Sequence, residues 1–100
     1  MTPNKIFTDN KLLNLNKLVS IVEEEGKRQV KKWGVQQHTL FEWLAYTTEE
    51  LGSTSKAISE YAYRGGPAEK VVSEAIQVAT LSLKIAEMVM VKNAHPQKKE

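Results

Sequence analysis

Residues 39–67, TLFEWLAYTTEELGSTSKAISEYAYRGGP, predict one long helix between a start signal and a stop signal. Thr39 and Glu42 have the spacing of a capping box, in which each residue satisfies a backbone N–H group at the helix start. The helix is expected to run to about Tyr63, because Arg64-Gly65-Gly66-Pro67 is a break and Pro67 suits the first position of another helix. Its apolar residues recur at helical spacing and predict a buried stripe of Leu40, Leu44, Leu51, Ile58 and Ala62.

Two further helices are predicted on either side of this segment. From Lys11 to about Lys32 the apolar positions have helical periodicity, and Trp33-Gly34 ends that pattern. From Pro67 to about Lys92 apolar residues cover two sides of the helix, more than two neighbouring helices of one chain can easily cover. We therefore expect an all-α fold, an antiparallel bundle of about three main helices, completed as a homodimer or homotetramer through the third helix.

Length and composition predict one domain in a reducing compartment. The chain has 100 residues, 41% apolar and 26% charged, with a net charge of +2 and no cysteine. The domain is expected over residues 11–92, between a flexible lead-in at 1–10 and a disordered tail at 93–100. No stretch has the apolar core of a signal peptide or the roughly 18 residues needed to span a bilayer. We expect a cytoplasmic protein without a membrane partner, and the small net charge makes nucleic acid an unlikely one.

Two acids stand where helices otherwise present apolar faces. Glu74 lies near the centre of the main apolar stripe of the third helix, and Glu50 lies at the edge of the stripe of the second. An isolated buried carboxylate costs several kcal/mol or takes up a proton. Either Glu74 meets a buried Lys or Arg and Glu50 is a residue at the rim, or both acids hold a divalent cation such as Mg²⁺, which prefers carboxylate oxygens. No obvious buried cation stands beside either acid, which favours the metal.

Other polar and aromatic residues allow two interpretations each. His38 is either a loop residue bound to backbone or part of a site. Trp33 and Trp43 either pack between helices or stack on a base. The cations Lys27, Arg28, Lys31 and Lys32 form either a solvated face or a contact surface for a triphosphate.

Several segments together resemble the MazG-like nucleotide pyrophosphohydrolases, an all-α family that converts nucleoside triphosphates to monophosphates and pyrophosphate. The resemblance covers roughly residues 28–90. It lies in the segments Lys32–His38, Trp43, Glu49–Gly52, Lys56–Ala57 and Glu74–Ala79.

The acidic motifs of that family match this chain in part. The family pattern is Glu-Glu-x-x-Glu on one helix and Glu-x-x-Asp on the next. Glu50 and Glu74 match it, whereas Ser53 and Gln77 stand where two further acids are expected.

The resemblance implies a Mg²⁺-dependent mechanism. Glu50 and Glu74 would hold the metal, and Glu49 would act with them as a catalytic residue that positions water. The remaining matched positions would bind substrate: Trp33, Gln36, His38, Lys56 and Gln77.

Three functions compete on this basis. The first is an active nucleoside triphosphate pyrophosphohydrolase, and the second is a catalytically impaired relative that senses nucleotides or binds proteins. The third is a small helical nucleic-acid binder that uses the cations of residues 27–32, whose affinity would fall steeply with salt.

Overall fold

The computed structural model describes residues 11–94, which form three α-helices and no strand. These are α1 (Leu15–Trp33), α2 (Leu40–Arg64) and α3 (Ala68–Ala94). The all-α prediction is confirmed for these residues, although α3 continues to Ala94 instead of ending at Lys92. The lead-in at 1–10 and the tail from 95 onward lie outside the described residues.

Both ends of α2 use the predicted signals. Thr39 Oγ1 accepts a hydrogen bond from the Glu42 N–H at 3.1 Å, and Glu42 Oε1 accepts one from the Thr39 N–H at 2.8 Å. At the other end Gly65 has a φ of 72°, a left-handed conformation that glycine adopts without steric cost. The Gly66 N–H donates to the Glu60 carbonyl at 2.9 Å, which closes the last turn of the helix.

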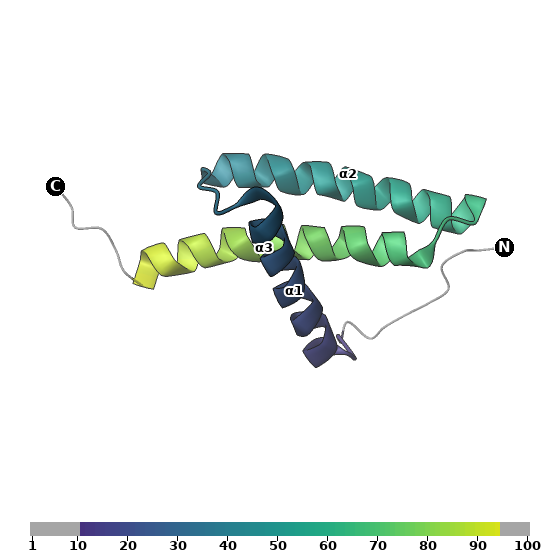
Figure 1. The fold of residues 1–100 in the computed structure, drawn as a ribbon, viewed down its shortest axis with the longest axis horizontal. Helices are drawn as coiled ribbons and strands as arrows, with labels where there is room; N and C mark the ends of the chain where they lie inside the picture. The colour runs from purple at the N-terminus through teal and green to yellow at the C-terminus, as the bar shows by residue number, and fades with distance from the viewer. Residues whose placement is uncertain (1–10, 95–100) are drawn as a thin grey trace.

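The three helices are arranged around α3 (Figure 1). α2 and α3 lie side by side and are joined by a short turn, whereas α1 crosses α3 at a steep angle. α1 and α2 each pack against α3 and not against each other. None of the described helices combines the length and apolar character that a membrane-spanning segment needs.

The apolar interior of the described chain is small. Its buried apolar side chains are Trp43, Ala57 and Leu81, from α2 and α3. Four polar residues are equally buried: Gln29, Thr54, Glu74 and Thr80. The two threonine hydroxyls are satisfied within their own helices, by the carbonyls of Glu50 and Ile76 at 2.8 Å each.

The predicted buried stripe of α2 is wrong for the single chain. Leu44 and Leu51 are 53% and 57% exposed, and Leu40 and Ile58 are also exposed. The side of α2 that meets α3 carries Trp43, Thr54 and Ala57, roughly 90° further round the helix at 100° per residue. These apolar side chains do share one side of α2, but no other part of the described chain covers them.

Candidate functional site

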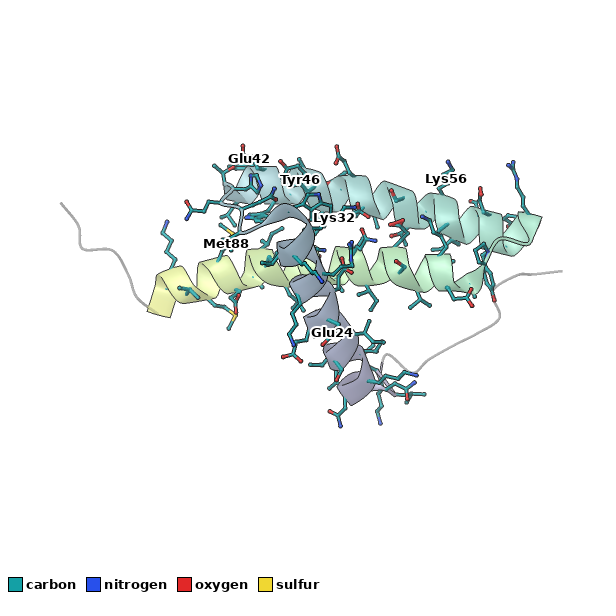
Figure 2. The ribbon with its side chains drawn as sticks, in the orientation of Figure 1. Glu24, Lys32, Glu42, Tyr46, Lys56 and Met88 are labelled. Atoms are coloured by element: carbon teal, nitrogen blue, oxygen red, sulfur yellow. The ribbon has the colours of Figure 1, made fainter. Side chains whose placement is uncertain are left out.

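A cleft of about 640 Å³ opens between the end of α1, the connector before α2 and the facing sides of α2 and α3. Six predicted site residues line it: Trp33, Gln36, His38, Glu49, Glu50 and Gln77. It also takes Tyr46 from α2 and Leu81, Lys84 and Met88 from α3. Figure 2 shows Tyr46 near the start of α2 and Met88 on the adjoining part of α3. Trp33, Gln36 and His38, at the end of α1 and in the connector, thus line the same cleft as Glu49, Glu50 and Gln77 of α2 and α3.

Glu50 and Glu74 form a pair of carboxyl groups beside this cleft. Glu74 is only 7% exposed, and Glu50 is partly buried. Burial raises the pKa of Glu50 above its ordinary value, and the neighbouring Glu74 carboxyl raises it further. Among residues 11–94, Glu50 Oε2 and Glu74 Oε1 are buried side-chain oxygens without a hydrogen-bond partner. Such atoms cost about 1–3 kcal/mol each unless something binds them.

A lysine contacts one oxygen of this pair. Lys70 Nζ lies 3.4 Å from Glu74 Oε2, one helical turn away on α3. The sequence analysis named no cation beside either acid, whereas Lys70 pairs with Glu74 from a side chain that is 62% exposed. The ion pair nevertheless neutralises part of the Glu74 charge and leaves its second oxygen unsatisfied.

The donor set fits a magnesium ion only in part. Carboxylate oxygens are suitable ligands, and Mg²⁺ commonly keeps several waters beside one or two carboxylates. Within the described residues no three His, Cys, Asp or Glu side chains cluster as a metal site. Ser53, which stands where the resemblance expects a third acid, is exposed and does not line the cleft. Glu50 and Glu74 therefore offer two ligands, with water and substrate needed for the rest.

Three aromatic rings form the wall of the cleft near its connector. The His38 ring lies edge-on to Trp43 and Tyr46, with centroids 4.8 and 5.0 Å apart. His38 Nε2 is 3.3 Å from Gln36 Oε1, and His38 Nδ1 is 3.6 Å from Glu42 Oε1. The imidazole is thus held by side chains rather than by backbone groups. Trp43 both packs in the interior and lines the cleft.

Trp33 stands at the exposed end of α1. It is 50% exposed, with Lys32 Nζ 4.8 Å and the Arg28 guanidinium 5.6 Å from its ring. Lys32 and Arg28, two members of the predicted cation cluster, thus lie near the Trp33 ring beside the cleft. The face of an aromatic ring attracts such cations electrostatically.

Lys56 is a predicted site residue that does not line the cleft. It borders a separate shallow depression with Glu60, Tyr63 and Arg64. In Figure 2 its side chain points away from α3, farther along α2 than Tyr46. The structure therefore does not bring Lys56 to the cleft.

A polar network links α1 to α3 and was missed by the sequence analysis. Arg28 donates two hydrogen bonds to Glu25, at 2.8 and 2.7 Å, and Gln29 Nε2 donates to Glu25 Oε2 at 2.7 Å. These bonds, the Arg28 bond foremost, lower the pKa of Glu25. Lys84 Nζ donates to Gln29 Oε1 at 2.5 Å. No sequence signal marks the bond between Gln29 and Lys84, because the two residues lie on different helices.

Comparisons of this chain with protein-family models, curated proteins and solved structures find no match. The chemistry of the cleft itself must therefore carry any functional proposal.

Proposed function

We propose that this chain is a Mg²⁺-dependent nucleotide pyrophosphohydrolase that hydrolyses nucleoside triphosphates to monophosphates and pyrophosphate. The supporting observation is the pair of unsatisfied carboxylate oxygens on Glu50 and Glu74, buried beside a cleft with an aromatic wall. A buried acid pair is unfavourable by itself, and a cation that binds both groups would remove that cost.

The residues of the cleft divide into two roles in this proposal. Glu50 and Glu74 hold the metal, which when bound neutralises phosphate oxygens. Glu49 orients a water molecule for attack on the α-phosphorus, so that a new P–O bond forms and the bond to the pyrophosphate leaving group breaks. The aromatic wall and the polar groups of Trp33, Gln36, His38 and Gln77 contact the base and sugar.

Pyrophosphate release from a panel of nucleoside triphosphates with Mg²⁺ tests this activity. We expect Glu50→Gln and Glu74→Gln to abolish release while the helical circular-dichroism signal is retained. Glu60→Gln, on the same helix but outside the cleft, is the matched control and should leave the rate unchanged. Full activity in both Glu50→Gln and Glu74→Gln would refute the assignment of the metal ligands.

The alternative is a catalytically impaired MazG-like module that senses nucleotides or binds proteins. Two observations favour it: only two carboxylates converge, and Lys70 already pairs with one of them. It predicts nucleotide binding without turnover. Calorimetric binding of a triphosphate by a protein that releases no pyrophosphate would establish this alternative.

We further propose that the protein is a cytoplasmic homodimer or homotetramer. In this assembly a second copy covers the apolar face of the hairpin, the pair of helices α2 and α3 joined by their short turn. The exposed residues Leu44, Leu51 and Ile58 of α2 lie on one side of that helix, and the third helix carries exposed Val72, Leu83 and Met90. Apolar area of this extent is typical of an interface and unusual on a monomer. Leu51→Lys should shift the mass measured by light scattering toward the monomer, whereas Lys56→Gln should not.

A further inference from the structure

Lys84 is a cation that lies inside the cleft. Among the cleft-lining residues it is the one lysine or arginine, and it stands on α3 opposite the aromatic wall. The other charged side chains that line the cleft are acidic: Glu49, Glu50 and Glu87. Lys84 lies about 2.8 helical turns from Glu74, at 3.6 residues per turn, which separates it along α3 from the acid pair.

The ammonium group of Lys84 is held in position without being neutralised. It donates to the neutral amide oxygen of Gln29 and lies 5.0 Å from the centre of the Trp43 ring. Within residues 11–94 no carboxylate lies within ion-pair distance of it. Arg28, by contrast, is paired directly with Glu25 at 2.7 Å.

The environment of Lys84 changes the pKa of its ammonium group. Burial lowers the pKa of Lys84, and the more distant charge of Glu25 offsets this effect in part. A partly buried ammonium ion has three donors, and the described residues take up one of them by a hydrogen bond. An anion in the cleft would therefore find an oriented donor that forms no ion pair with a carboxylate of residues 11–94.

We propose that Lys84 binds an oxygen of the polyphosphate group of a ligand in the cleft, with Gln29 and Trp43 fixing its ammonium group. The inference deepens the proposed function and rests on it for the nature of the ligand. The acid pair meets one part of the polyphosphate through a cation, and Lys84 meets another part directly. Charge-assisted hydrogen bonds of this kind are among the strongest in proteins.

Calorimetric titration of the full chain with inorganic tripolyphosphate in Mg²⁺ tests the inference. We expect Lys84→Gln to weaken binding about tenfold or more, as expected for loss of a hydrogen bond to a charged group. Glutamine can still donate to Gln29, and Lys84→Arg keeps the charge and should retain more affinity than Lys84→Gln. The control Lys92→Gln makes the same charge change at an exposed position of α3 outside the cleft and should bind like the wild type.

A second arm uses a non-hydrolysable α,β-methylene nucleoside triphosphate. Tighter binding of this analogue than of tripolyphosphate identifies a nucleotide as the source of the phosphates, and equal binding identifies inorganic polyphosphate. In either case Lys84→Gln must weaken binding. Wild-type affinity in folded Lys84→Gln, or no binding of either probe to the wild type, would overturn the inference.

Failure of this inference is distinguishable from failure of the proposed function. Lys84-dependent binding without pyrophosphate release would refute the hydrolase alone. Pyrophosphate release that is unchanged in Lys84→Gln, together with unchanged binding, would refute the role of Lys84 alone.

Discussion

Replacing Glu50 with glutamine should make the metal-free protein more stable at pH 8. Glu50 and Glu74 bring two carboxyl groups together, and each has a buried oxygen that finds no hydrogen-bond partner in the described part of the chain. A glutamine amide keeps the size of the side chain, removes one charge and can donate a hydrogen bond to Glu74. An unsatisfied buried polar atom costs about 1–3 kcal/mol. Because Glu50 is only partly buried, we expect a gain near the lower limit, about 1 kcal/mol, or about 4–8 °C in Tm.

The size of this effect should depend on pH. The pKa of Glu50 is raised in the folded chain by burial and by the Glu74 carboxyl, so the folded protein binds this proton more tightly than the unfolded one. The wild type is therefore relatively most stable below the unfolded pKa and loses that stability as pH rises through the folded pKa. The advantage of Glu50→Gln should be largest at pH 8 and should disappear below about pH 4, near the unfolded pKa of a glutamate.

Thermal unfolding in EDTA, followed by circular dichroism at 222 nm, measures this difference. Glu49→Gln makes the same charge change at the adjacent, exposed position and should alter stability by no more than about 0.5 kcal/mol. Added Mg²⁺ should raise the Tm of the wild type but not that of Glu50→Gln, because ligand binding stabilises only a fold that holds the ligand. A lower Tm for Glu50→Gln than for wild type at pH 8 would refute the picture of two uncompensated carboxylates.

Three further results are expected. Lys70→Met should tighten Mg²⁺ binding severalfold in a calorimetric titration, because it removes the cation that competes for Glu74 Oε2; weaker binding would contradict this competition. Ser53→Glu should also tighten Mg²⁺ binding if the longer side chain reaches the acid pair from its exposed position on α2, and an unchanged titration would show that it does not. Thr39→Ala should lower stability by about 1 kcal/mol in a urea titration, because the capping box is lost, whereas the exposed Thr48→Ala should have a smaller effect.

The boundaries of α2 could be predicted because the signals for them are local, whereas α1 begins at Leu15 and not at the predicted Lys11. Thr39 and Glu42 contact each other within one helical turn, and the left-handed Gly65 needs no partner from elsewhere in the chain. These signals depend on residue spacing, which the sequence contains directly. Glu50 also lies beside Glu74 as expected, but the expected reason was wrong, because the apolar stripe of α2 does not pack on α3.

The packing face of α2 could not be predicted in the same way. A helical wheel identifies an apolar stripe but not the element that covers it, and Leu44 and Leu51 face away from α3. Trp43, Thr54 and Ala57 meet α3 instead, although two of them are small and one is polar. The contacts of Lys84 could not be predicted for a related reason, because Gln29 and Trp43 approach it only in the folded chain.

The manner in which α1 is attached has a consequence for motion. This helix forms one side of the cleft, yet of the other two described helices it packs against α3 alone, to which the bond between Gln29 and Lys84 joins it. Segments with few buried contacts open at a lower free energy than the rest of a fold. Backbone amides of α1 should therefore exchange with deuterium sooner than those in the middle of α2 and α3, and ligand entry can proceed through local opening that leaves the hairpin intact.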